Sequence, residues 1–273
     1  MRYVSVKDVR LYNGWLPIEE KKQPLKKIGE TVFQTPHAPL VDADWDGSVY
    51  DDVLVYLGGE HVEPESIDPS TGLISIHPPP SQGTSVEADY FWHPIGDEDI
   101  ILAVEAAEGL VEALTGVVYV PHQRVERRRI ERNGLVALSE PVITVQSVKL
   151  YDSFGNFLGE AEATLVDRAA GILKIRVVSQ EPRPPWYLPS YVEAEVEYVG
   201  GYESVPAIVK HAVLALSSHN LLTRFQQRLA LAPDYGGGVS TVFVAEDLEK
   251  RLRFLRNEVE KTVNSLPRRV EKA

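Results

Sequence analysis

The chain has 273 residues, of which 44% are hydrophobic and 25% charged, a composition typical of a soluble protein long enough for two compact domains. Its formal net charge of −12 argues against a protein that coats DNA, because binding to phosphates requires clustered Lys and Arg. The absence of cysteine excludes disulfides and thiol chemistry. No apolar run reaches the roughly 18 residues of a membrane span, and the N-terminal sequence lacks the apolar core of a signal peptide.

The N-terminal third is predicted to contain few helices. Residues 1–31 are polar and carry a lysine-rich run that Pro24 interrupts, so we expect an extended arm with one short strand at Tyr3–Val6. Residues 32–95 alternate apolar and polar positions between turns rich in Gly and Pro, which predicts an N-terminal β module.

A second β-rich segment resembles the first one about 100 residues later. Residues 50–92 and 147–198 each contain a Val-x-x-Tyr strand, an Asp before a Gly-Ile/Leu strand, a proline-rich connector and a Val-Glu-Ala strand that ends in Tyr. We interpret them as a duplication. The alternative is two independent β segments that share only turn residues.

Three segments have helical spacing of apolar residues. Asp97–Thr115 places acidic residues in its first turn and Gly116 after its end. A longer helix is predicted from Val205 to the residues before Pro233, and a third helix covers Ala245–Leu266.

These elements predict an α+β fold, in which about three helices, one of them long, form a bundle that carries two related small β modules. The second module is inserted between the first and second helices and contains an Arg-rich hairpin. The predicted boundaries are an arm (1–31), an N-terminal β module (32–95), a helical core (96–116 and 203–266), an inserted β module (117–202) and a basic tail (267–273).

The segment around the second predicted helix carries a family resemblance. A strand of alternating apolar and Glu residues runs from Val192 to Tyr198, and Gly200 and Gly201 then provide a sharp corner. The run VEYVGGYESVPAIVKHAVLALSSHNLLTRF resembles the closing segment of the head-to-tail adaptor proteins of tailed phages and archaeal tailed viruses. The matching residues are Tyr198, Gly200, Gly201, Tyr202, Val205, Pro206, Ile208, Ala212 and Arg224. More weakly, the resemblance extends over residues 97–232.

The resemblance implies a structural virion protein without catalytic activity or cofactors. It implies a ring, usually of twelve copies, at the neck of the particle, assembled in the host cytoplasm and not in a membrane. The expected partners are the portal protein, a tail or tail-completion protein, and DNA that passes through the channel without sequence-specific binding. The alternative function is a β-rich carbohydrate- or calcium-binding module of a tail or surface protein.

Two groups of residues are candidate contact sites. The third predicted helix has an apolar seam followed by a basic tail, and we expect this segment to dock on the portal. Its residues are Leu248, Leu252, Leu255, Val259, Leu266, Arg268 and Arg269.

One basic cluster stands out in an otherwise acidic chain. It is either a salt-bridged hairpin at a subunit contact or a contact to passing DNA or an acidic partner, and consists of Arg124, Arg127, Arg128, Arg129 and Arg132.

One acidic motif matches the opening of a calcium loop, with Asp42, Asp44 and Asp46 followed by Gly47. Its twelfth position is Val53, not the Glu that supplies two ligand atoms, so an acidic turn is the favoured interpretation and calcium the weaker one. The seven histidines are scattered and no catalytic constellation is recognisable, so we expect neither a metal centre nor an enzyme.

Overall fold

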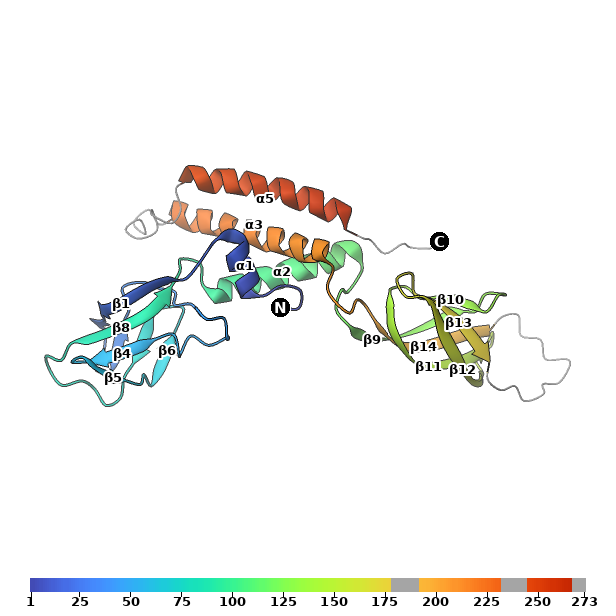
Figure 1. The fold of residues 1–273 in the computed structure, drawn as a ribbon, viewed down its shortest axis with the longest axis horizontal. Coiled ribbons are helices and arrows are strands. Elements are labelled where there is room, and N and C mark those ends of the chain that lie inside the picture. Colours follow the sequence, from blue (N-terminus) through green and yellow to red (C-terminus); the bar gives the residue numbers. More distant parts are fainter. Residues whose placement is uncertain (178–191, 232–244, 267–273) are drawn as a thin grey trace. The chain divides into compact units, whose positions relative to one another are not determined.

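The computed structural model describes residues 1–177, 192–231 and 245–266 (Figure 1). The chain divides into two compact units. The first comprises Met1, Tyr3–Glu108 and His211–Asn264, and the second comprises Arg2, Gly109–Lys210 and the residues from Ser265 onward.

The first unit contains a β module of two antiparallel four-stranded sheets, which we call the first β module. One sheet has the order β1-β8-β4-β5 and the other the order β2-β3-β7-β6. The strands are β1 (Ile18–Pro24), β2 (Lys26–Lys27), β3 (Val32–Gln34), β4 (Leu54–Leu57), β5 (Glu60–Val62), β6 (Ser66–Asp68), β7 (Leu73–Ser75) and β8 (Val86–Trp92).

The two sheets share one apolar core. Strand β8 alternates buried and half-buried residues along its whole length, because successive side chains of a strand point to opposite faces. Its buried residues pack with Val55 of β4, Phe33 of β3 and Ile74 of β7. Residues from both sheets therefore stabilise the module together.

The helices of the described chain are α1 (Val6–Asn13), α2 (Asp97–Thr115), α3 (Ala207–Leu231) and α5 (Ala245–Ser265). Helix α3 is buried at Ala212 and Val213 and again at four consecutive positions from Ala215 to Ser218, so other parts of the chain surround this middle stretch of the helix, whereas Ile208 and Arg224 nearer its ends are exposed. Asn13 of α1 donates to Ser218 Oγ (2.7 Å), and an ion pair (2.8 Å) joins His211 of α3 to Glu258 of α5. No helix in the described ranges is long and apolar enough to cross a membrane.

The second unit is built on one six-stranded antiparallel sheet with the order β10-β13-β12-β11-β14-β9, which we call the second β module. A tight turn at the predicted Asn133-Gly134 position joins its two end strands. Glu131 N–H donates to the Leu135 carbonyl across this turn, and Gly134 has a φ of +76°. The strands are β9 (His122–Arg129), β10 (Leu135–Ala137), β11 (Val142–Asp152), β12 (Phe157–Asp167), β13 (Ile172–Val177) and β14 (Val192–Gly200).

The two β modules have the same strand order. The run β1-β8-β4-β5 of the first corresponds to β9-β14-β11-β12 of the second, and β3-β7-β6 corresponds to β10-β13-β12. Where the first module uses the two short strands β5 and β6, the second uses the single 11-residue strand β12. This difference turns two sheets into one, and the shared order is that predicted for a duplication.

Equivalent side chains repeat as well. Tyr56 lies opposite the Glu of the first Val-Glu-Ala strand, and its hydroxyl donates to Asp89 (2.9 Å). Tyr151 lies opposite the Glu of the second such strand, and its hydroxyl donates to Glu195 (3.3 Å). The same register and the same tyrosine–carboxylate bond indicate a common origin more directly than the turn residues do.

The predicted fold class is wrong. Three β-sheets form the larger part of the architecture, and the helices form no bundle of about three helices with small β modules attached. The apolar stripes correctly predicted α2, α3 and α5 to within two residues at their starts. The size of the sheets was underestimated because β12 places exposed acidic residues between half-buried alanines and so gives a weak apolar signal.

The N-terminal segment also differs from the prediction. The expected strand at Tyr3–Val6 does not form, and helix α1 occupies this region instead. Ser5 and Asp8 form a reciprocal capping box, in which Asp8 N–H donates to Ser5 Oγ (3.2 Å) and Ser5 N–H to Asp8 Oδ2 (2.8 Å). Gly14 ends the helix with a φ of +71°. Strands β1 and β2 then occupy the rest of the segment predicted as an arm.

Candidate functional site

The corner between β14 and α3, which carries the family resemblance, is shaped by two glycines with little room around them. A Cβ at Gly201, where φ is +95°, would collide with the backbone carbonyl of Val120. A Cβ at Gly200 would collide with the Glu140 carboxylate and the Tyr198 ring. Only glycine fits at either position, so the sequence of this corner follows from its geometry.

A buried polar cluster lies directly beneath the corner. The fully buried Tyr198 donates from its hydroxyl to Glu126 Oε1 (2.7 Å) and to Glu140 Oε1 (3.4 Å). The Ser139 hydroxyl also donates to Glu126, and His122 Nε2 lies 3.0 Å from Glu140 Oε1. We call these five residues the corner cluster. It joins strands β9 and β14 to the segment between β10 and β11.

The surroundings of Glu126 and Tyr198 determine which of the two side chains is ionised. Burial opposes ionisation of Glu126, but hydrogen bonds from Ser139, Tyr198 and Arg128 outweigh it and lower the pKa of this carboxyl. Burial first, and then the neighbouring Glu126, raise the pKa of Tyr198. The tyrosine therefore stays a neutral donor and the glutamate an ionised acceptor over the whole physiological range of pH.

The predicted arginine cluster lies mainly along β9, and three of its members pair with glutamates of the same module. Arg124 contacts Glu126 (3.1 Å) and Glu140 (3.3 Å), whereas Arg128 Nε donates to Glu126 (3.0 Å). Arg127 pairs with Glu193 of β14 at 2.8 Å.

The strand register gives the outward arginines acidic neighbours. Arg127 stands opposite Glu195 and Arg129 stands opposite Glu193, whereas Arg132 is exposed in the turn that follows β9. Arg127 also lies over the Tyr151 ring, 4.2 Å from its centroid. Three of the arginines are thus salt-bridged within the module, but the ladder partner of β9 is β14 and not the other strand of the predicted hairpin, β10. A subunit contact and a DNA contact for this surface both stay predictions.

The apolar seam predicted to dock on the portal faces the chain's own interior. Leu248, Leu255 and Leu266 are buried, and Leu252 and Val259 are half-buried. Their burial means that in this conformation the seam is occupied by contacts within the chain. Arg268 and Arg269, the basic part of the same prediction, lie outside the described residues.

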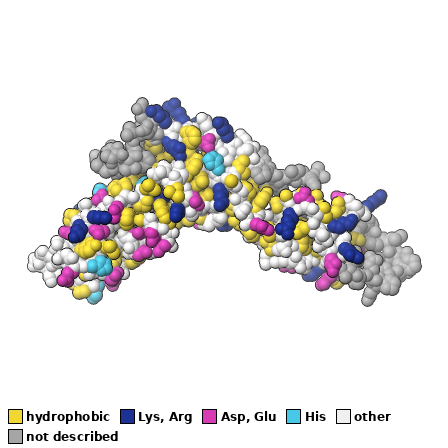
Figure 2. Space-filling model, viewed as in Figure 1, with side chains coloured by type: hydrophobic (Ala, Val, Ile, Leu, Met, Phe, Trp, Pro, Cys, Tyr) yellow, Lys and Arg dark blue, Asp and Glu magenta, His cyan; other side chains and the backbone are white. Residues whose placement is uncertain are grey.

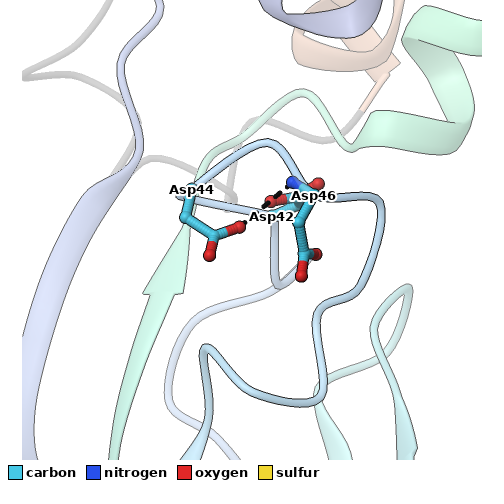
Figure 3. A group of neighbouring side chains, drawn as sticks. All are labelled: Asp42, Asp44 and Asp46. Carbon is cyan, nitrogen blue, oxygen red and sulfur yellow. Dashed lines mark hydrogen bonds between the residues drawn. The ribbon is translucent and has the colours of Figure 1, made fainter.

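The acidic motif does form a cluster. One carboxylate oxygen from each of Asp42, Asp44 and Asp46 lies within 4.8 Å of the others (Figure 3). Asp42 accepts backbone N–H bonds from Trp45 (2.6 Å) and Gly47 (2.7 Å), as in an ordinary acidic turn. The carboxylates could hold a calcium ion, but their main observed role is to fix the loop before β4.

Sequence reasoning missed the members of the corner cluster other than Tyr198. Ser139 and Glu140 lie in a short link between strands, where neither the helical nor the strand period applies. The only local signal is the glycines that must leave room around Glu140, and this signal becomes interpretable once the strands are paired.

No protein-family model and no curated protein matches the chain. Among solved structures, the chain is similar to a chain in the neck of an empty gene transfer agent (GTA) particle computed with C6 symmetry. The identity is 22%, the TM-score is 0.31, and the match covers 45% of this chain and 65% of that one. A chain from the virion of a native GTA particle is 21% identical with a TM-score of 0.31, and the match covers 45% of this chain and 64% of that one.

A chain from the neck of a native GTA particle computed with C12 symmetry gives 22% identity, a TM-score of 0.31, and coverage of 45% and 69%. The chain thus spans about two thirds of the length of these GTA chains, while less than half of it takes part in the match. A TM-score of 0.31 establishes no common fold.

Proposed function

We propose that this chain is a structural protein of a phage-like neck, an adaptor that docks under the portal and connects the DNA-filled head to the tail. The observation that carries the proposal is the corner between β14 and α3. Its residues Tyr198, Gly200 and Gly201 match the head-to-tail adaptor pattern, and each has a physical role in the structure.

The corner is suited to a scaffold. Tyr198 and the two crowded glycines fix where the strand ends and the 25-residue helix α3 begins. The groups of the corner cluster that could do chemistry are engaged with one another, since Glu126 accepts from Ser139, Tyr198 and two arginines. A carboxylate saturated in this way supports positioning, and we propose no catalytic role for it.

The finer parts of the proposal concern the partners. We propose a closed ring, of twelve copies as the family resemblance implies, with DNA passing through it. The pairing of Arg124, Arg127 and Arg128 with glutamates supports a wall that does not hold DNA by its phosphates. Portal docking through the C-terminal segment is part of the same proposal. Because the seam is covered by the chain itself, we propose that the affinity comes from residues after Leu266, including Arg268 and Arg269.

A genetic and imaging experiment tests the proposed function. Particles from a strain lacking this chain are examined by electron microscopy, and particles from the complemented strain are labelled with an antibody against it. We expect DNA-filled heads and free tails in the first preparation and label at the head–tail junction in the second. Intact tailed particles without the chain would contradict the proposal, as would label on tail fibres, which favours the carbohydrate-binding alternative.

A further inference from the structure

Helix α2 has an apolar face that the described parts of its own chain leave exposed. One side is fully buried at Ile100, Val104, Ala107 and Val111. The opposite side is exposed, and it is apolar except for two glutamates. The residues of this α2 outer face are Glu98, Leu102, Glu105, Ala106, Gly109, Leu110 and Ala113, with Leu102 57% and Leu110 44% exposed. Exposed leucines at helical spacing on a well-buried helix are typical of a surface that another helix covers.

Gly109 shapes this face. A glycine in a helix interior lowers helix stability relative to alanine, so its presence there needs a reason. A Cβ built at Gly109 would meet no atom of the chain within 4 Å. Packing within the chain therefore does not require the glycine. Because Gly109 carries no side chain, the surface next to Leu110 leaves room for a side chain from another molecule.

Helix α5 presents a different outer face. Its buried residues Leu248, Leu255 and Thr262 lie on one side. The opposite side carries cations around one exposed aromatic ring, with Phe254 47% exposed. The residues of this α5 outer face are Lys250, Arg253, Phe254, Asn257 and Lys261. Figure 2 shows Lys and Arg side chains gathered where Figure 1 places α5.

The charges of the two faces are complementary. Helix α2 has six acidic residues and no basic one, and Glu98 and Glu105 are exposed on its outer face. Glu105 lies 3.8 Å from the Met1 ammonium, a pair on the surface that is easily exchanged for another. The α5 outer face has three cations, and two exposed glutamates, Glu249 and Glu260, border it on the Arg253 side. Arg253 is paired with Glu249 along its own helix, but both side chains are exposed, and such a pair is easily exchanged for another.

The shapes are complementary too. Leu102, Glu105, Ala106 and Gly109 have the i, i+3, i+4, i+7 spacing of a hole that receives one side chain of a facing helix. Phe254 is the only large apolar side chain on the α5 outer face. We propose that Phe254 of one copy of this chain packs into this hole on α2 of a neighbouring copy.

The register of the contact follows from helix geometry. With Phe254 in the hole, Glu98 and Lys261 each lie roughly 10 Å along their helices from the centre, at 1.5 Å per residue. Antiparallel helices bring these two charges together, whereas parallel helices separate them. The contact joins two different surfaces, so it is heterologous, and repeating it generates a ring if the rotation closes. The inference rests on the proposed ring and identifies the surfaces that would make it.

Complementing variants test the pairing. Gly109→Trp fills the hole, and its side chain has room on the folded chain. Phe254→Asp removes the inserted ring. We expect each variant alone to be a monomer by analytical ultracentrifugation. An equimolar mixture should form dimers of twice the 30.4 kDa chain mass, because one intact α2 face and one intact α5 face remain. Leu16→Asp, an exposed leucine on neither face, is the control and should assemble like the unaltered chain.

Cross-linking tests the contact even where the free chain assembles weakly. The chain has no cysteine, so Ala106→Cys on one copy and Asn257→Cys on another provide the only thiols in a mixture. At millimolar concentration, a short bismaleimide should join the two variants and should not join either variant to itself. Failure to cross-link, or dimers of a single variant, would overturn the proposal.

The outcomes separate this inference from the proposed function. Rings that form without the α2–α5 cross-link would leave the neck function intact and reject these surfaces. A cross-linked α2–α5 contact in a protein that is absent from the head–tail junction would support these surfaces and reject the neck function.

Discussion

In the first β module Tyr90 is buried among apolar side chains, and this burial raises its pKa to about 12. In the second module the buried tyrosine of the equivalent strand, Tyr198, lies two positions further along and corresponds to Trp92. Both side chains donate to a glutamate of the neighbouring strand, Trp92 Nε1 to Glu20 (3.4 Å) and the Tyr198 hydroxyl to Glu126 (2.7 Å). The second module adds further polar partners around its glutamate, and its strand β14 leads into α3 through the glycine corner. The comparison indicates that the corner cluster fixes this junction.

The largest effect is expected from removing the central carboxylate of the second module. Glu126→Ala removes the acceptor of Arg128 and of the Ser139 hydroxyl and leaves Tyr198 with its longer bond to Glu140, so we expect a loss of about 3–5 kcal/mol in the free energy of unfolding. Urea denaturation of the full chain measures it. The matched change in the first module, Glu20→Ala, removes an acceptor of Trp92 Nε1 (3.4 Å) and Gln23 Nε2 (3.1 Å) but breaks no arginine pair, so it should cost less, about 1–2 kcal/mol. Equal losses would show that the two interiors do not differ in energy.

The glycine corner should be nearly as sensitive. Gly201→Ala places a side chain at a φ of +95° and against the Val120 carbonyl, so we expect a loss of about 2–4 kcal/mol. Gly83→Ala in the first module is the control, because its φ is +88° but its Cβ would meet nothing within 4 Å. This control isolates the backbone cost, which should be about 1 kcal/mol. Two equal values would mean that the close approach to Val120 relaxes freely.

The modules should respond to acid in opposite directions. In the first, burial and then the nearby carboxylates of Asp44, Asp42 and Asp51 raise the pKa of Asp52 to about 6, although the Ala43 N–H opposes the shift. The folded state then binds the proton more tightly than the unfolded chain, so stability is lost as pH rises from about 4 to 6. We expect Asp52→Asn to raise the urea midpoint at pH 7 and to leave it unchanged at pH 4.

Glu126 of the second module should make stability depend on pH in the opposite direction. Its pKa is lowered, so its contribution is present at neutral pH and is lost only as pH falls through the lowered value. The difference in stability between the unaltered chain and Glu126→Gln should therefore be constant at neutral pH and shrink in strong acid. A difference that grew on acidification would contradict the assigned ionisation state.

A smaller effect should be common to both modules. Tyr56→Phe and Tyr151→Phe each delete one tyrosine–carboxylate hydrogen bond on a half-exposed surface, so each should lower the urea midpoint only slightly. Chemical denaturation of the two variants checks this. Lys22 lies over the first ring at 5.9 Å and Arg127 over the second at 4.2 Å, so the second variant should lose slightly more. A large difference between the stability losses of the two variants would weaken the case for a duplication.

The smallest effect is expected from calcium. The acidic turn lacks a bidentate Glu at its twelfth position, Val53, so millimolar calcium should change the melting temperature by less than about 2 °C. Differential scanning calorimetry with and without calcium measures this. A rise of many degrees that Asp44→Ala abolishes would identify a calcium site and distinguish the first module from the second.

Patterns local in sequence predicted much of this fold. The alternation in Val192–Tyr198 correctly predicted β14, and Asn133-Gly134 correctly predicted the turn between β9 and β10. Helix α1 was missed because its eight residues hold only a few apolar side chains, Val6, Val9 and Leu11 among them, which is too short a run to define a helical period. Its capping box depends on two side chains.

Contacts between distant residues were beyond the sequence. Arg124 was recognised as part of a basic cluster, but its partner Glu140 lies on a link that only strand pairing brings near. The α5 seam shows a second limit. Spacing reveals that Leu248 and Leu255 share one face, but it does not reveal whether that face is covered by the same chain or by a partner.

The position of β14 within its sheet has a mechanical consequence. β14 is hydrogen-bonded to β11 along one edge and to β9 along the other. These bonds run perpendicular to the strand. A force that pulls α3 along the axis of β14 therefore loads both ladders in shear, so that many bonds resist together, whereas an edge strand would peel away one bond at a time. The helix is thus anchored where the sheet best withstands tension.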